Sequence, residues 1–409
     1  MKILNIIQRY PPAIGGSEVW CQGACRFLSQ NGFKVEVLTL KVYHEDEYWH
    51  PPTCDNCLAQ LGDVELDGKI LVRRFSPNEI SPVFQVFFKY FLDKRLNLYF
   101  YGPHSLSLYL NIFKYIKEAD ILHLHTIPYP HNFIGYFLGR FLNKKVVITP
   151  HFHPGHNFYE RPANYWLIRN CDAIFAVSDY EKEYFISKGI EPQKIYVIYN
   201  ALYPEDYLPS DLENFKRNLF DRFKMGPDTK IVLFIGRKIE YKGIKVLVEA
   251  AKRIIHKRDI RFFLIGPNFP WFEEFYASFS EEKKKRIIDL GILTHQEKVN
   301  MLHLADCLIL PSRHEAFGIV FLEAWICGKP VIGVDTGVVP KLIKDAGLVS
   351  PPDNADILIS QIEFILNNPE VAIKIGQKGK EMVLNNFTWD KVGKNLLAAY
   401  KKVLGLTVS

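Results

Sequence analysis

The chain has 409 residues, of which 48% are hydrophobic and 23% are charged, and this favours two or three ordinary globular domains. Its net charge of +6 mildly favours anionic ligands or an anionic membrane face. The charge is too small to indicate nucleic-acid binding, and no recognition-helix, zinc-finger or single-strand-binding motif accompanies it.

Apolar β-rich runs alternate with helical patterns along the whole chain. Each run is rich in Val, Ile or Leu and is bounded by turn residues. The alternation predicts an α/β protein in which both halves are Rossmann-like, doubly wound parallel sheets. Strands are expected at residues 2–8, 34–40, 69–74, 120–124, 145–149, 172–177, 194–198, 230–236, 260–266, 287–292, 306–311, 330–334 and 346–349.

A glycine loop follows the first predicted strand. Gly15 and Gly16 allow the backbone to approach a ligand closely, and Ser17 is the predicted N-cap of the next helix. No G-x-G-x-x-G motif is present here, which argues against a nicotinamide enzyme.

Two segments of the first half do not fit the strand pattern. Residues 41–68 are expected to be an insertion, and its cysteines and histidines are either unligated, which we favour, or a structural zinc site. These side chains are His44, His50, Cys54 and Cys57. Residues 82–101 are aromatic and basic; they predict an ordinary core helix or, alternatively, a helix that contacts a membrane surface or a lipid-linked acceptor.

Histidines stand at the ends of two predicted central strands. His151 follows the strand at 145–149, and His123 and His125 lie at the end of the strand before it. A neutral imidazole in this place can bond to sugar hydroxyls or polarise a reacting centre. We expect a site role for His151, whereas His125 is expected to be a satisfied polar group.

The cellular location is predicted from three features of the sequence. No apolar run approaches the roughly 18 residues that a membrane span needs, and the apolar start of the chain lacks a signal-peptide cleavage site. Seven scattered cysteines, an odd number, favour a reducing compartment. We expect a cytoplasmic protein, with peripheral contact at the inner membrane face as an addition.

A linker is predicted at residues 199–210, which contain two prolines and no periodicity. The second predicted domain then begins with a buried strand that leads into a polar loop containing Arg237 and Lys242. Ligands of open α/β sheets bind at the carboxyl ends of the strands. Because Arg grips a phosphate with two bonds and Lys adds a point charge, the two residues are expected to neutralise a diphosphate without a metal ion.

The strongest functional signal follows the strand at 306–311. That strand leads through a turn at Phe317 and Gly318 into a predicted helix, so that the N–H groups of Phe317, Gly318 and Ile319 can point at an anion.

Two carboxylates flank this turn. Glu315 and Glu323 are eight positions apart, and on a helix this spacing of just over two turns would let both flank one ligand. A sugar joined to a nucleotide through a diphosphate has the matching shape, with hydroxyls at both ends and negative charge in the middle.

On these motifs the chain resembles, over essentially its whole length, the retaining glycosyltransferases of the GT-B fold, family 4 (group 1). The resemblance rests on Glu315-x7-Glu323 with Phe317-Gly318, on Gly236-Arg237 with Lys242-Gly243, on Gly15-Gly16, and on Thr149-Pro150-His151. The chain departs from the family pattern at Asn200-Ala201, where the family often has Asn-Gly, and at residues 336–343, which lack the usual paired glycines and following Glu.

The resemblance implies an architecture as well as an activity. Two Rossmann-like domains are expected to face each other across a cleft: an acceptor-binding domain at residues 1–203 and a nucleotide-sugar-binding domain at 204–388. The last helix, at 389–409, is expected to cross back to the first domain.

The resemblance also implies roles for individual residues. Arg237 and Lys242 would hold the donor diphosphate, and Glu315 would meet hydroxyls of the donor sugar. Glu323 would meet the ribose, and the amides of residues 317–319 would meet the phosphates.

In the first domain, His151 would meet the donor sugar, and the loop of Gly15 and Gly16 would lie near the diphosphate and the acceptor. The predicted activity is that of a hexosyltransferase-type enzyme of class EC 2.4, which moves a sugar from a nucleotide-diphosphate sugar, UDP- or GDP-linked, to an acceptor hydroxyl. The acceptor is expected to be a glycan, a lipid-linked sugar or a small molecule, and no cofactor and no metal are expected. A nucleotide-sugar epimerase of the same fold and a non-catalytic nucleotide-sugar-binding protein are the alternatives.

Overall fold

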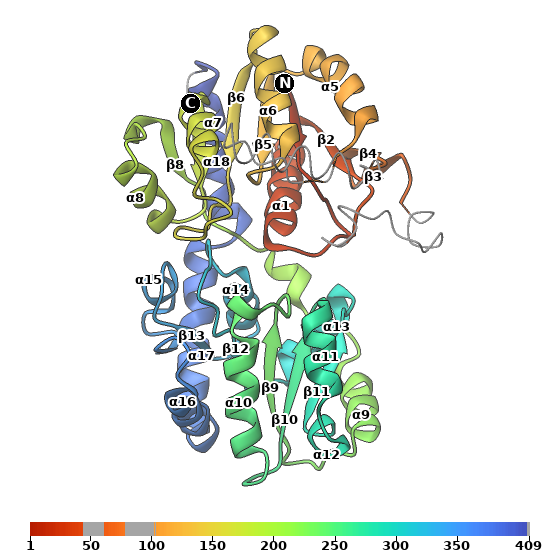
Figure 1. Ribbon diagram of the computed structural model, residues 1–409, viewed down its shortest axis with the longest axis vertical. Coiled ribbons are helices and arrows are strands. Elements are labelled where there is room, and N and C mark those ends of the chain that lie inside the picture. The colour runs from red at the N-terminus through yellow and green to blue at the C-terminus, as the bar shows by residue number, and fades with distance from the viewer. Residues whose placement is uncertain (44–60, 78–101, 103, 407–409) are drawn as a thin grey trace. The chain divides into compact units, whose positions relative to one another are not determined.

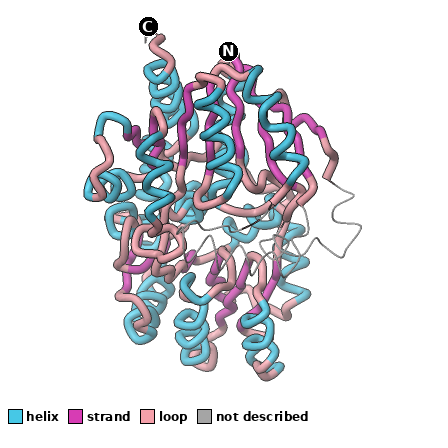
Figure 2. Tube along the Cα trace, turned by 45° about the horizontal axis from the view of Figure 1, so that its top comes forward, coloured by secondary structure: helices cyan, strands magenta, loops and turns pink. Residues whose placement is uncertain are grey.

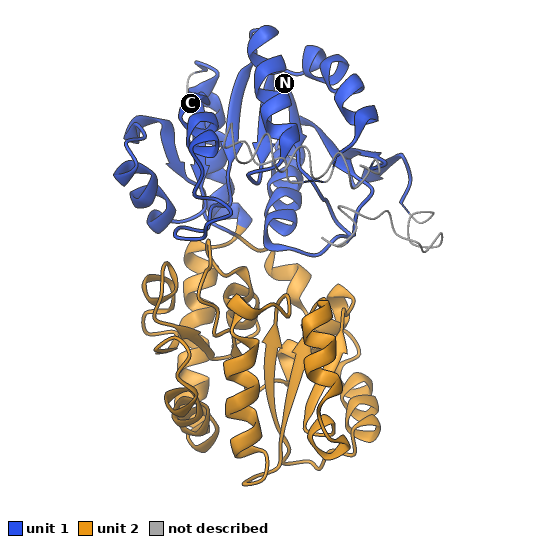
Figure 3. Ribbon diagram, in the orientation of Figure 1, with its two compact units in different colours: residues 1–200, 389–409 blue, residues 201–388 orange. Residues whose placement is uncertain are grey.

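The computed structural model describes residues 1–43, 61–77, 102 and 104–406. Within these ranges the chain forms two compact units, one of residues 1–200 and 389–409 and the other of residues 201–388 (Figure 3). The proposed zinc ligands His44, His50, Cys54 and Cys57, and the aromatic segment at 82–101, lie outside the described residues.

Unit 1 contains an eight-stranded sheet in the order β3-β4-β2-β1-β5-β6-β7-β8. The strands are β1 (Lys2–Ile6), β2 (Lys34–Leu40), β3 (Val64–Asp67), β4 (Ile70–Phe75), β5 (Ile121–His125), β6 (Lys145–Thr149), β7 (Ala173–Ala176) and β8 (Ile195–Val197). Its helices are α1 (Gly16–Gln30), α5 (Leu106–Glu118), α6 (Pro130–Phe141), α7 (Pro162–Asn170), α8 (Asp179–Ser187) and α18 (Trp389–Val403), with a short 3-10 turn at Pro192–Lys194 (Figure 1).

Unit 2 contains a six-stranded sheet in the order β11-β10-β9-β12-β13-β14. The strands are β9 (Lys230–Ile235), β10 (Ile260–Ile265), β11 (Ile287–Gly291), β12 (Cys307–Ile309), β13 (Val331–Val334) and β14 (Gly347–Ser350). The helices are α9 (Leu212–Arg222), α10 (Ile244–Ile254), α11 (Pro270–Ala277), α12 (Glu281–Lys284), α13 (His295–Leu304), α14 (Ile319–Ile326), α15 (Val339–Ile343), α16 (Ala355–Asn367) and α17 (Pro369–Asn386), with 3-10 turns at Pro204–Tyr207 and Glu240–Lys242.

The central strands are buried on both faces, because each sheet is packed against helices (Figure 2). All five residues of β5 and all six of β10 are buried. In the parallel register of unit 1, Ile3 on β1 lies opposite Val35 on one side and Ile121 on the other. The carboxyl ends of the central strands therefore lie along one edge of each sheet.

The prediction of two doubly wound parallel sheets is confirmed, with one exception at an edge. Strand β3 lies in the predicted insertion and runs antiparallel to β4, with Val64 opposite Arg73 and Asp67 opposite Ile70. Strand β3 was not predicted because it lacks a run of apolar residues, and its apolar residues Val64 and Leu66 are exposed. Strand β12 is also shorter than the predicted 306–311, although the N–H of Leu310 still donates to the carbonyl of Ile332 at 2.9 Å.

Helix α18 completes the core of unit 1. The Trp389 ring lies 5.9 Å from that of Trp20, and a Cβ added to Gly23 on α1 would come within 2.1 Å of the Trp389 indole nitrogen. Further along α18, the hydroxyl of Tyr400 is 2.6 Å from Nδ1 of His123 on β5. The last helix thus fills space inside unit 1 that only a glycine on α1 leaves open.

Candidate active site

In unit 2, the loop after β9 carries the two predicted cations. Arg237 lies two residues after the end of β9 and donates to the hydroxyl of Tyr241, and Lys242 ends the 3-10 turn before α10. Gly243 has φ 75°, and a Cβ there would come within 2.0 Å of the carbonyl oxygen of Pro311. A glycine is therefore required where this loop contacts the loop after β12.

A lysine that the sequence analysis did not single out anchors the same loop. The side chain of Lys238 has 0% exposure, and its Nζ lies 2.8 Å from Asp289 Oδ1 and 2.9 Å from Asn268 Oδ1. The amine also donates to the carbonyl of Gly266. The three donors of this ammonium group are thereby used on β11 and on the loop after β10, and Lys238 is next to Arg237 in the chain.

The carboxylate that pairs with Lys238 also has hydrogen-bond donors on both of its oxygens. Asn268 donates to the second oxygen of Asp289 at 2.9 Å, and the backbone N–H of Gly291 donates to the first at 2.9 Å. Burial lowers the pKa of Lys238, and Asp289 opposes this shift. Because all of its donors are taken, Lys238 is built to fix the β9 loop rather than to contact a ligand.

The two glutamates each meet a different lysine. Glu315 Oε1 lies 2.6 Å from Nζ of Lys242, so one predicted site cation is paired with one predicted site acid. Glu323 Oε1 lies 2.7 Å from Nζ of Lys298 and accepts from the hydroxyl of Tyr207 at 2.9 Å. The other oxygen of Glu323 is buried and has no hydrogen-bond partner.

The helical spacing used to place both glutamates beside one ligand does not apply to Glu315. Helix α14 begins at Ile319, so Glu315 lies in the preceding loop and only Glu323 lies on the helix. Gly318 is the N-cap with φ 91°, and there a Cβ would come within 2.7 Å of the Phe321 ring. This left-handed turn, which glycine adopts readily, is what starts the helix after the loop.

Phe317, Gly318 and Ile319 form the start of α14, as the sequence predicts. No acidic side chain occupies the first turn of this helix, and no side chain caps it. The positive end of α14 and the side chain of Glu315 therefore belong to the same short segment, and Lys242 contacts that segment through Glu315.

In unit 1, the Gly15–Gly16 loop is shaped by a buried acid. The carboxylate of Glu18 folds back so that a Cβ on Gly15 would lie 2.1 Å from Glu18 Oε2. Glu18 Oε1 accepts from Arg9 Nε at 2.9 Å, and Ser17 Oγ donates to Glu18 Oε2 at 2.8 Å. The prediction of Ser17 as N-cap is wrong: the N-cap is Gly15, and the Ser17 hydroxyl is drawn to the carboxylate.

His151 stands at the end of β6 in a strained conformation. Its φ is 49°, its side chain is buried, and its ring lies 5.7 Å from that of Trp20. Burial lowers the pKa of His151 to about 3, which keeps the imidazole neutral, and its Nε2 has no hydrogen-bond partner. A left-handed non-glycine residue is costly and persists only where its surroundings fix it.

A buried carboxyl group fixes the loop that carries His151. Glu181 on α8 accepts from the N–H of Phe152 at 2.8 Å and from the N–H of Val177 at 2.6 Å. Burial raises the pKa of Glu181 to about 8, while the two N–H donors act to lower it. Glu181 thus joins the loops after β6 and β7, and it was not predicted from the sequence.

His123 and His125 lie deeper in unit 1 than His151. Their rings are 3.9 Å apart, His123 lies 2.7 Å from the Thr149 hydroxyl, and His125 lies 3.0 Å from Asn5 Oδ1. Burial lowers the pKa of both rings well below the usual value. The contacts of His123 are with core residues of unit 1, as expected for a satisfied polar group, whereas Nδ1 of His125 is buried without a hydrogen-bond partner.

Unit 2 therefore brings together six of the predicted residues, namely Arg237, Lys242, Glu315, Phe317, Gly318 and Ile319, with Glu323 one helix turn further on. Unit 1 carries Gly15 and Gly16 at the start of α1 and His151 just after the end of β6. Four supporting side chains were missed: Lys238, Lys298, Tyr207 and Glu181. Only Glu323, the partner of Lys298 and Tyr207, was indicated by the sequence. Within the described ranges, no cluster of three or more metal-binding side chains occurs and no helix is long and apolar enough to cross a bilayer.

Comparisons with known proteins match both units. The family described as Glycosyltransferase Family 4 matches residues 14–206, and Glycosyl transferases group 1 matches residues 215–382. An uncharacterized glycosyltransferase of Methanocaldococcus jannaschii is 24% identical over 407 residues, 98% of both chains. An N-acetyl-alpha-D-glucosaminyl L-malate synthase of Bacillus anthracis is 25% identical over 348 residues, 81% of this chain and 87% of that protein.

A solved structure agrees with these sequence matches in fold. Anabaena HepE, crystallised in complex with UDP and glucose, superposes with a TM-score of 0.72 at 18% identity and covers 98% of this chain and 99% of its own. The two sheets, the site segments and the matches to both halves lead to one conclusion. The chain belongs to the family 4, group 1 glycosyltransferases with the GT-B fold, and it is a hexosyltransferase-type enzyme of class EC 2.4.

Proposed function

We propose that this enzyme is a retaining glycosyltransferase that takes a sugar from a nucleotide-diphosphate sugar and transfers it to an acceptor hydroxyl without a metal ion. The observation that carries the proposal is the segment around Lys242, where a cation, Glu315 and the start of α14 adjoin. A diphosphate-linked sugar needs these three features together.

Arg237 and Lys242 are proposed to bind the donor diphosphate. Lys242 is paired with Glu315 at 2.6 Å, so a bound diphosphate would compete with that carboxylate for the ammonium group. Glu315 would then turn to the hydroxyls of the sugar beside the diphosphate. The N–H groups of residues 317–319 supply further donors to the phosphates.

Glu323 is proposed to bind the nucleoside ribose. Its Oε1 is held by Lys298 and Tyr207, and its Oε2 is buried without a partner. A carboxylate oxygen that is fixed in place and has no donor suits a hydroxyl pair of a sugar ring. UDP and GDP are the proposed carriers, and the HepE structure with UDP supports the first.

Unit 1 is proposed to bind the acceptor. Gly15 and Gly16 would contribute backbone near the diphosphate and the acceptor, and His151 would contact the donor sugar. Since burial lowers the pKa of His151 to about 3, its ring is neutral and suits a hydroxyl better than a phosphate. The acceptor is proposed to be a glycan, a lipid-linked sugar or a small molecule, and a lipid-linked acceptor would bring the cytoplasmic enzyme to a membrane surface.

The proposed chemistry breaks the bond between the anomeric carbon and the phosphate oxygen. Arg237, Lys242 and the start of α14 stabilise the negative charge that develops on the leaving diphosphate. The acceptor hydroxyl attacks on the same face of the sugar and gives its proton to the leaving phosphate. No separate side-chain base is then needed, which accounts for retention of configuration.

Two other functions fit the same fold less well. An epimerase would need an acid and a base carboxylate at the reacting carbon, but Glu323 is held by Lys298 and Tyr207, and Glu315 alone could not serve as both. A binding protein without activity would not need the charges that stabilise a leaving group. Donor hydrolysis or transfer, measured first with donor alone and then with candidate acceptors, separates the three.

The test of the donor site is a pair of substitutions with a matched control. Arg237→Ala and Lys242→Ala are each expected to lower turnover by about 100- to 1,000-fold, the usual cost of one charge-stabilising donor. Lys245→Ala removes an exposed lysine that pairs with Glu240 at the start of α10, and it should leave turnover unchanged. Near-normal transfer by both site variants would exclude the proposed donor site.

A further inference from the structure

The outer side of α5, α6 and α7 in unit 1 exposes large apolar side chains. Phe141 is 78% exposed and Leu110 is 73% exposed, and the grouping of such side chains on one surface, rather than the exposure of any one of them, is what indicates a function. We call this surface the α5–α7 face; its apolar residues are Leu106, Leu110, Phe113, Phe137, Phe141 and Trp166.

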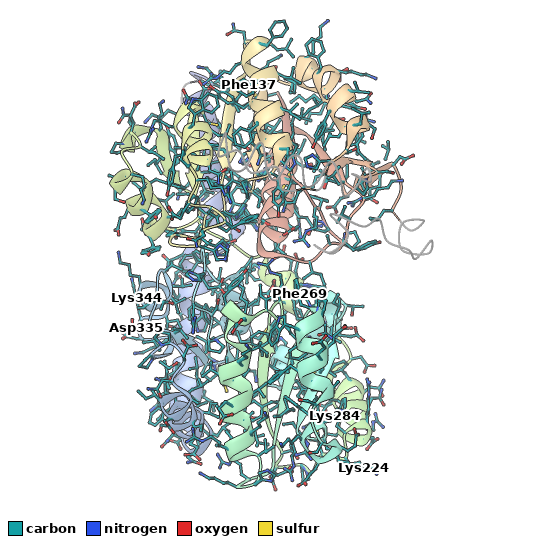
Figure 4. All side chains as sticks on the ribbon, in the orientation of Figure 1. Phe137, Lys224, Phe269, Lys284, Asp335 and Lys344 are labelled. Carbon is teal, nitrogen blue, oxygen red and sulfur yellow. The ribbon has the colours of Figure 1, made fainter. Side chains whose placement is uncertain are left out.

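These side chains form a continuous strip across the three helices. The rings of Phe113 on α5 and Phe141 on α6 have centroids 6.4 Å apart. The rings of Phe137 on α6 and Trp166 on α7 stack at 5.5 Å, and Phe137 is labelled in Figure 4. Phe137 and Phe141 are four residues apart, so they project from the same side of α6.

The charges beside the strip are mostly positive. The three helices carry four cationic side chains and one acid: Lys114, Lys117, Arg140, Arg169 and Glu118. Arg140 is paired with Asp172 at 2.9 Å, and Glu118 is paired with Lys2 at 3.0 Å. Among the described residues, no ion pair involves Lys114, Lys117 or Arg169.

We propose that the α5–α7 face docks on an anionic lipid surface, with the aromatic and leucine side chains in the headgroup region and the lysines against lipid phosphates. Phe, Trp and Leu beside Lys and Arg are the composition that favours the interface of a bilayer. A second copy of this chain fits less well, because two basic faces would repel each other. This inference names the surface for the membrane contact that forms part of the proposed function.

None of these residues belongs to the proposed donor or acceptor site, so docking and catalysis can be tested separately. The probe is a vesicle of phosphatidylcholine with phosphatidylglycerol, compared with vesicles of phosphatidylcholine alone. Wild-type protein is expected to float with the anionic vesicles at low salt and to dissociate as salt is raised.

Three variants then divide the contributions. Phe137→Ser with Phe141→Ser should lower vesicle affinity at least tenfold at every salt concentration. Lys114→Gln with Lys117→Gln should lower it about 30-fold at low salt, because each lysine near an anionic surface contributes about fivefold. Ile373→Ser on α17, which removes a side chain that is 60% exposed in unit 2, should leave affinity unchanged.

The outcomes decide between occupants. Wild-type protein that ignores anionic vesicles, or binding that is equal in all three variants, overturns the proposal. A dimer in light scattering that Phe141→Ser dissolves assigns the face to a second copy instead. Variants of the α5–α7 face that lose vesicle binding but keep normal transfer to a soluble acceptor support docking. If neither the wild-type protein nor any variant transfers a sugar, only the proposed function is contradicted.

Discussion

Replacing Lys238 with methionine isolates the buried ion network under the β9 loop. The substitution keeps most of the side-chain volume but removes the charge, and it leaves Asp289 with a side chain that is 12% exposed. Removing one partner of a buried pair costs about 3–5 kcal/mol. Asp289 retains donors from Asn268 and Gly291, so we expect a loss of about 3 kcal/mol of unfolding free energy, the lower end of that range.

An ion pair at the other end of β9 offers a control. Lys230 at the start of β9 pairs with Asp306 at 3.2 Å, but these side chains are 37% and 29% exposed. Lys230→Met should therefore cost about 0–1 kcal/mol. A double variant, Lys238→Met with Asp289→Asn, removes both charges and should recover part of the loss.

Urea unfolding and donor kinetics are the two assays. If Lys238 positions Arg237, the donor KM of Lys238→Met should rise at temperatures where the protein is fully folded, and the double variant should regain stability without regaining donor affinity. Equal stability losses in Lys238→Met and Lys230→Met would refute the reasoning from burial. An unchanged donor KM in a destabilised Lys238→Met protein would confine Lys238 to a structural role.

Three further predictions concern pH, metal and stereochemistry. Burial raises the pKa of Glu181 to about 8 from its usual 4.5, so the folded state holds a proton that the unfolded state has lost between these pH values. Stability should therefore fall by about 1.4 kcal/mol per pH unit across that window, and urea unfolding of Glu181→Gln should lack this component of the slope. Turnover should survive EDTA, because cations and a helix terminus already meet the diphosphate; activity that is lost in EDTA and restored by magnesium or manganese would contradict this. An α-linked donor should give an α-linked product by the anomeric NMR coupling, and a β-linked product would require a base, with His151 examined first.

Much of the fold could be predicted from local sequence, because buried parallel strands have continuous apolar runs. The runs before Arg237 and before Pro311 fixed where β9 and β12 lie, and Gly243 and Gly318 marked the turns that follow. The contacts that the side chains of these loops make were harder to predict from the sequence. That Lys242 meets Glu315 rather than solvent depends on a contact 73 residues along the chain.

The missed residues share one cause. Lys238 is an ordinary polar residue in the sequence, and only its partners on β11 and in the loop after β10 make it a buried anchor. Glu181 lies in a helix start where an acid is expected on local grounds, yet its oxygens bind N–H groups of two neighbouring loops. Whether an ionisable side chain is buried depends on how the strands and loops pack together, so a local sequence pattern does not predict it.

The place of α18 in unit 1 has a consequence for the order in which the chain is made. A ribosome releases residues 201–388, the whole of unit 2, before it adds the helix that contributes Trp389 and Tyr400 to the core of unit 1. Until then, the space beside Gly23 and the Nδ1 of His123 lack their partners. Unit 1 is therefore the first to begin folding during synthesis and the last to finish, unlike the usual sequence in which N-terminal domains mature first.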